Sequence, residues 1–202
     1  FTTTGSSILS DVEALSHSSL MWRSFSHWVG GMGVLVFLLA VIPMSGGSNI
    51  NLMKAESPGP SVGKLVPKIR STARILYMIY IGLSVIMFLL LLVGKMPMFD
   101  ALATTFGTAG TGGFGIKNNS MAGYSHYIQW VVTVFMLLFG VNFNAYYLIL
   151  FLDVKKAFKI EEVKWYFTII LLSAFVIFTD LMQFYPSLGD AVRDSFFQVA
   201  TI

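Results

Sequence analysis

The sequence contains no cysteine and few charged residues. Without cysteine among its 202 residues, the chain has no disulfide framework, no thiolate metal site and no cysteine nucleophile. Charged residues make up only 11% of it, against about 25% in an ordinary soluble domain. The 55% of apolar residues leave too little polar surface for a water-soluble particle, so the surplus must face lipid. We therefore expect an all-α membrane protein that crosses the bilayer several times.

A small positive charge does not indicate nucleic acid as a partner. The net charge is only +3, and the basic residues lie in short stretches beside apolar runs, which is the positive-inside pattern of membrane proteins. His17, His27 and His126 are isolated, with no second ligand at helical spacing, so we expect packing or interfacial roles and no metal site. A membrane enzyme should carry a polar catalytic constellation inside its spans, and the first three apolar runs contain no carboxylate. We expect no enzyme activity and no covalent cofactor.

Four apolar runs predict membrane spans. They cover residues 24–53, densest at 28–44, then 75–93, 118–152 and 165–179. The third run is interrupted at residues 140–144, where Asn142 and Asn144 either satisfy a broken helix or line a pore. The tryptophans lie near predicted span ends and are interpreted as interfacial anchors: Trp22, Trp28, Trp130 and Trp165.

A further apolar segment, residues 96–116, is not typical of a span. It holds five glycines between Gly107 and Gly115, too many for a stable helix facing lipid. If the segment enters and leaves on one side of the membrane, nine Lys and Arg residues lie on one side and four on the other. If it spans the membrane, the two sides hold seven and six. The nine are Lys54, Lys64, Lys68, Arg70, Arg74, Lys155, Lys156, Lys159 and Lys164, opposite Arg23, Lys95, Lys117 and Arg193. The positive-inside rule therefore favours a re-entrant half-helix.

These segments predict a repeating unit of span, re-entrant pore helix, Gly/Thr loop and span. We expect the end of one repeat at residues 1–53, a cytoplasmic loop at 54–74, a complete repeat at 75–152, a second cytoplasmic loop at 153–164 and the start of a third repeat at 165–202. Asp190-Ala191-Val192 echoes Asp100-Ala101-Leu102, which places the third half-helix near Ser187. The chain is accordingly expected to be an internal fragment.

Two loops rich in Gly and Thr are the candidate ion sites. Their residues are Thr2, Thr3, Thr4 and Gly5, and then Gly110, Thr111, Gly112 and Gly113. They offer carbonyl and hydroxyl oxygens without a carboxylate, which suits a monovalent cation that must bind and leave, as in the carbonyl-lined filters of K⁺ channels. Glycine allows neighbouring carbonyls to point one way. The preceding half-helix would direct its negative end at the ion.

These residues resemble a known family. The strings FTTTGSS, HWVGGMGV, TAGTGGFG and GVNFNAYY, which begin at Phe1, His27, Thr108 and Gly140, are similar to the TrkH-type membrane subunit of the Trk/Ktr/HKT superfamily of potassium transporters. The resemblance implies four repeats around one pore in a bacterial inner membrane, with Gly5 and Gly113 as filter glycines. It also implies a homodimer and a cytosolic nucleotide-binding regulatory ring of the TrkA kind.

Within that resemblance the transported ion is K⁺, placed at Thr3, Thr4, Thr111 and Gly112. A Na⁺-permeable transporter of the same superfamily is the alternative, since HKT relatives of that kind carry Ser at the position that matches Gly5. A helical bundle without transport function, in which the glycines only pack helices, is the other alternative. The same glycines match the dinucleotide pattern, but no strand precedes them and no acidic residue follows at the required distance. Asp11 and Glu13 either concentrate cations or belong to a solvated outer loop.

Overall fold

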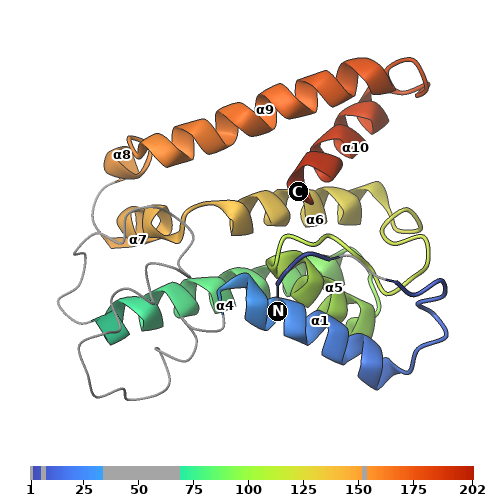
Figure 1. Ribbon diagram of the computed structural model, residues 1–202, viewed down its shortest axis with the longest axis horizontal. Coiled ribbons are helices and arrows are strands. Elements are labelled where there is room, and N and C mark those ends of the chain that lie inside the picture. The colour runs from blue at the N-terminus through green and yellow to red at the C-terminus, as the bar shows by residue number, and fades with distance from the viewer. Residues whose placement is uncertain (1, 6–7, 34–68, 152–153) are drawn as a thin grey trace.

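The computed structural model describes residues 2–5, 8–33, 69–151 and 154–202, and its regular structure in these ranges is helical throughout (Figure 1). Most of the first expected span and most of the loop expected at 54–74 lie outside the described residues. The helices are α1 (His17–Gly31), α4 (Ile69–Val93), α5 (Met98–Ala109), α6 (His126–Gly140), α7 (Phe143–Phe151), α8 (Val154–Ala157), α9 (Glu161–Leu181) and α10 (Leu188–Ala200).

Among the described residues, two helices are long and apolar enough to cross a bilayer. The qualifying segments, Ala73–Val93 of α4 and Glu161–Leu181 of α9, each have 21 residues. At 1.5 Å per residue each is about 31 Å long, close to the thickness of the hydrocarbon core. Helices α6 and α7 pass the same test as a pair bent by 90°. The chain is therefore a helical membrane protein, as the composition predicts.

The bend between α6 and α7 confirms the expected break in the third apolar run. Asn142 accepts a hydrogen bond from the Asn144 amide at 2.9 Å and donates to Glu162 Oε2 at 2.7 Å. The hydroxyls of Tyr146 and Tyr166 donate to the carbonyls of the last turn of α6, at 2.6 and 2.8 Å. A broken helix in lipid needs such partners for its freed backbone groups. Asn142 thus provides a hydrogen-bond partner for a backbone amide at the break, which is the first of the two roles considered for it.

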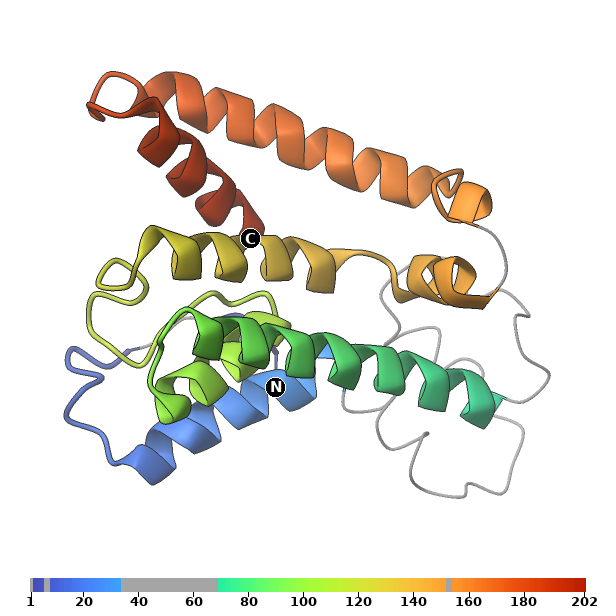
Figure 2. The ribbon, with the colours of Figure 1, turned by 180° about the vertical axis from the view of Figure 1, so that it is seen from behind.

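Helices α5 and α10 begin where a long helix ends and turn back toward the middle of the molecule (Figures 1 and 2). With 12 residues, α5 is too short to span; it starts after Pro97 and has Asp100 in its first turn, where a carboxylate favours the positive helix end. The chain then returns to the same end of the molecule, where α6 starts. Residues 98–125 therefore enter and leave at one end. Which end faces the cytoplasm stays a prediction.

The centre of the bundle is built where α1, α4 and α5 meet. The Tyr80 hydroxyl donates to the Trp28 carbonyl at 2.8 Å, and the Trp28 indole donates to Ser84 Oγ at 3.0 Å. The Trp28 ring also packs against Phe106 of α5, with centroids 5.6 Å apart. Trp28 therefore packs between α1, α4 and α5, and its interpretation as an interfacial anchor is wrong. The sequence alone does not show this packing, because α4 and α5 are distant from Trp28 along the chain. Trp22, in contrast, is 62% exposed.

Candidate functional site

The two candidate loops have the same unusual backbone. In the first loop (residues 2–5) Thr3 and Gly5 have φ of 53° and 71°, and in the second loop (residues 110–115) Thr111 and Gly113 both have 62°. The residues between them, Thr4 and Gly112, are not in the positive-φ region. When the backbone alternates in this way, successive peptide groups turn their like atoms toward one side. Each loop therefore repeats one backbone geometry, in which the sign of φ alternates from residue to residue.

The threonines make this geometry costly. A β-branched residue at positive φ is a genuine outlier, with a cost on the order of 1–3 kcal/mol that the surrounding structure must offset. Both loops carry this strain at the equivalent position, Thr3 and Thr111. Such strain clusters at ligand sites.

The two loops meet at their glycines. A Cβ atom placed on Gly5 would lie 3.7 Å from both Gly112 Cα and Phe114 Cδ1. Beside this contact is a hollow of about 290 Å³. Its lining consists of Thr2, Thr3, Thr4, Gly5, Arg23, His27 and Phe114. The fold thus brings together the four candidate residues of the first loop with Gly112 of the second, over a separation of more than a hundred residues.

The second loop is held by the end of α5. The Thr111 amide donates to the Thr108 carbonyl at 2.7 Å, and the Gly112 amide donates to the Gly107 carbonyl at 3.1 Å. The negative end of the half-helix is therefore directed at this loop, where it favours a cation. The Thr111 hydroxyl donates to the Gly110 carbonyl at 2.7 Å.

Gly113 lies apart from Gly5, in a crowded place between α6 and the end of α10. A Cβ atom there would be 2.6 Å from Met136 Sδ and 2.9 Å from Thr201 Cγ2. Thr201 follows the last residue of α10. The second loop consequently lies against the first loop at Gly112 and against the end of α10 at Gly113.

Arg23 and His27 are residues of this site that the sequence reasoning missed. Arg23 Nη1 donates to the Gly115 carbonyl at 3.3 Å, and its guanidinium lies 4.0 Å from the centroid of the Phe114 ring. The His27 ring makes an edge contact with the same ring at 4.9 Å between centroids. The sequence offered one indication that the two residues act together. They are four positions apart, which places both side chains on one face if the helix expected from residue 24 begins slightly earlier.

The segment between the first loop and α1 is hydrogen-bonded to the chain just after the second loop. Asn118 Nδ2 donates to the Asp11 carboxylate at 2.9 Å, while the Val12 amide donates to Asn118 Oδ1 at 2.7 Å. The Asn118 amide donates in turn to Glu13 Oε1 at 3.0 Å. The hydrogen bond from Asn118 lowers the pKa of Asp11 below 3.8, with help from the amides of Ala14 and Glu13. Asp11 and Glu13 therefore join the segment before α1 to the connection between α5 and α6, and both lie at exposed positions.

We expect Asn118→Ala to lower the unfolding temperature of the purified protein near neutral pH. The Asp11 pKa is depressed on folding, so this stabilisation is present above its unfolded value of 3.8 and is lost as the pH falls through the folded value. The difference between wild type and variant should therefore shrink below about pH 3.8. Thermal unfolding of wild type and variant, near neutral pH and again below about pH 3.8, measures this difference, with Asn119→Ala as the control. A difference that is the same at both pH values would contradict this account of the hydrogen bond between Asn118 and Asp11.

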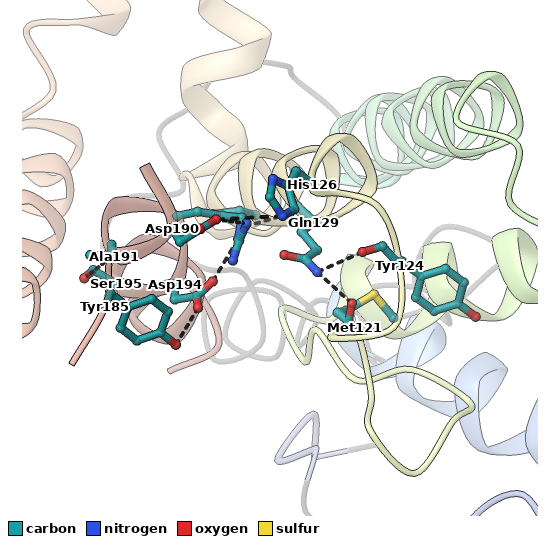
Figure 3. A network of polar contacts seen from close by, with 11 residues as sticks. Met121, Tyr124, His126, Gln129, Tyr185, Asp190, Ala191, Asp194 and Ser195 are labelled. Atoms are coloured by element: carbon teal, nitrogen blue, oxygen red, sulfur yellow. Dashed lines mark hydrogen bonds and ion pairs between the residues drawn. The ribbon is translucent and has the colours of Figure 1, made fainter. Parts of the chain in front are cut away.

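A second polar network holds the first turns of α10 beside the start of α6 (Figure 3). The buried Arg193 pairs with Asp190 at 2.6 Å and with Asp194 at 2.8 Å, and His126 Nε2 lies 3.8 Å from Asp190. The hydrogen bond from the Tyr185 hydroxyl to Asp194, at 2.8 Å, raises the Tyr185 pKa. The network positions α10, whose far end reaches Gly113.

Gln129 of α6 secures the connection between the second loop and α6 (Figure 3). Its Nε2 donates to the carbonyls of Met121 and Tyr124, at 3.1 and 3.0 Å. The Tyr124 hydroxyl donates to Asp100 at the start of α5, at 2.9 Å. The connection between the second loop and α6 is thus hydrogen-bonded both to α6, through Gln129, and to the start of α5, through Asp100.

Within the described ranges, no three His, Cys, Asp or Glu side chains are grouped as a metal site would require. The oxygens that the two loops offer are uncharged carbonyls and hydroxyls. Such a donor set suits a monovalent ion better than Mg²⁺ or Ca²⁺, which favour carboxylates.

Comparison with known proteins gives a consistent result. A family model described as TrkH, cation transport protein, matches residues 1–192. The Trk system potassium uptake protein TrkH of Salmonella typhimurium is 32% identical over 206 residues, covering 100% of this chain and 43% of the relative. The protein of the same name from Escherichia coli K12 is 31% identical, with the same coverage. TrkG of Escherichia coli K12, also called a Trk system potassium uptake protein, is 33% identical over 74% of this chain and 31% of its own length. The chain thus spans less than half the length of these relatives.

Proposed function

The chain belongs to the TrkH family of cation transport proteins, and on this premise we propose that it forms part of the K⁺ path of a potassium uptake system. The observation that carries the proposal is the repeated backbone geometry of the two loops, with positive φ at Thr3 and Gly5 and again at Thr111 and Gly113. A helix-packing seam of small residues would explain the glycines, but it would not explain two strained threonines at equivalent positions.

The ion sites that we propose use the oxygens of Thr3, Thr4, Thr111 and Gly112. The sign of φ alternates along each loop, and in this proposal the carbonyls of successive residues turn toward one path and replace part of the hydration shell of the ion. The contact between Gly5 and Gly112 supports one path shared by both loops. Two further loops from other repeats would complete the ring, as the resemblance to the superfamily implies.

Ion uptake by the intact transporter that carries this segment tests the proposal. Expressed in bacteria that lack their own potassium uptake systems, it should restore growth at low K⁺ and take up K⁺ and Rb⁺ in preference to Na⁺. Equal uptake of Na⁺ and K⁺ would favour the Na⁺-permeable alternative. No cation uptake by protein that reaches the membrane would contradict the proposal.

The remaining parts of the proposal concern location and partners. We propose a multi-pass protein of the bacterial inner membrane, assembled as a homodimer with a cytosolic nucleotide-binding ring of the TrkA kind. The bacterial relatives and the apolar helices α4 and α9 support the membrane location, and the resemblance supports the partners. Cross-linking of the solubilised transporter, followed by identification of the subunits that remain with it, checks the assembly.

A further inference from the structure

We propose that Arg23 and His27 of α1 are positioning residues for the second loop, so that a helix of the first repeat sets the ion selectivity of the second repeat. The inference rests on the proposed function, because it takes residues 110–115 to line the ion path. It concerns two side chains that need not touch the ion. They act through the Phe114 ring and the loop backbone.

Arg23 holds the end of the loop in two ways. Its Nη1 atom donates to the Gly115 carbonyl at 3.3 Å, and the guanidinium lies over the Phe114 ring at 4.0 Å. A planar guanidinium can stack on a ring while its edge donates a hydrogen bond, which a lysine ammonium cannot do in the same place. The Gly115 amide is fixed from the other side, since it donates to Ser120 Oγ at 3.0 Å. Arg23 therefore restrains the Gly115 carbonyl and the Phe114 ring together.

His27 bounds the loop one helical turn further along α1. It is buried, at 6% exposed, and its Nε2 lies 2.5 Å and 2.6 Å from the points where Cβ atoms of Gly110 and Gly112 would stand. The imidazole thus occupies the space that side chains at these two positions would need. The ring sets how far the loop backbone can move toward α1.

Phe114 couples these contacts to the first loop. Its ring touches both positioning residues, and its Cδ1 atom lies 3.7 Å from the Cβ position of Gly5. A movement of this ring would therefore disturb the first loop at Gly5 as well as the second loop at Gly112. Selectivity depends on the placement of carbonyl dipoles around the ion, so small shifts here should change ion preference before they change stability.

The experiment compares substitutions on one helix in the intact transporter. We expect Arg23→Gln, Arg23→Lys and His27→Gln each to reduce the preference for K⁺ over Na⁺ by about tenfold, which corresponds to a change of about 1.4 kcal/mol in the difference between the binding free energies of the two ions. The readouts are inhibition of Rb⁺ uptake by Na⁺ and the unfolding temperature of the purified protein. Trp22→Phe is the control, because Trp22 is on the same helix and is 62% exposed.

Arg23→Lys separates positioning from charge. Wild-type selectivity in Arg23→Lys would show that only the positive charge matters and would overturn the proposal. Unchanged selectivity with a lowered unfolding temperature in all three variants would mean a purely structural role and would overturn it too. If Arg23→Gln has no further effect once Phe114→Leu is present, the path through Phe114 is supported. Changed selectivity in Gly5→Ser, with all three variants unaffected, would leave the proposed function standing and reject this inference alone.

Discussion

Thr111→Lys should abolish K⁺ uptake by the intact transporter while the protein still folds and inserts. Thr111 is half-buried in the second loop, next to the proposed ion sites. Two unit charges 4 Å apart repel by about 4 kcal/mol at an effective dielectric constant of 20, which corresponds to a loss of about a thousandfold in ion occupancy. The backbone should tolerate the change, because the position already holds a β-branched residue at φ 62° and lysine is no worse there.

Uptake of Rb⁺, measured together with the amount of protein in the membrane, tests this expectation. Asn119→Lys is the matched control, since it adds the same charge to an exposed position in the connection between α5 and α6. Asn119→Lys should leave uptake close to wild type. Wild-type uptake by correctly assembled Thr111→Lys would show that the second loop does not line the path.

The sequence predicted the features that depend on local chemistry. The break after Gly140 was predicted because two asparagines interrupt an apolar run, and the structure has a 90° bend there. The short helix α5 was expected because five glycines cannot continue a helix in lipid. In each case the responsible residues lie within a few positions of the feature that they cause.

Features that depend on distant contacts could not be predicted in the same way. The hydrogen bond from Arg23 to Gly115 joins residues 92 positions apart, and no local pattern marks its partner. Trp28 was misinterpreted for the same reason, because the side chains that bury it come from α4 and α5. For His27 the sequence predicted a packing or interfacial role but could not indicate that its partners are the glycines of a candidate ion site.

The glycines of the two loops should differ in how they tolerate a side chain. A Cβ atom on Gly5 would make only ordinary contacts, at 3.7 Å, so the main cost of Gly5→Ser comes from its φ of 71°, about 1–2 kcal/mol. Relief of that strain would rotate the neighbouring peptide groups away from the ion. We therefore expect Gly5→Ser to fold and to admit Na⁺, with a tenfold loss of preference requiring only about 1.4 kcal/mol.

Gly113→Ser combines the same strain with overlap. Its φ is 62°, and its Cβ would lie 2.6 Å from Met136 Sδ and 2.9 Å from Thr201 Cγ2. We expect lower expression and lower uptake as well as lost selectivity. Met136→Ala should restore part of the expression but not the selectivity, because it removes the overlap with Met136 and leaves the overlap with Thr201 and the backbone strain. Gly82→Ser on α4 is the control, since nothing lies within 4 Å of its Cβ position. Competition among K⁺, Rb⁺ and Na⁺ in these variants measures the effect. Wild-type ion preference in well-expressed Gly5→Ser would show that Gly5 only packs against the second loop and that the first loop is not part of the filter.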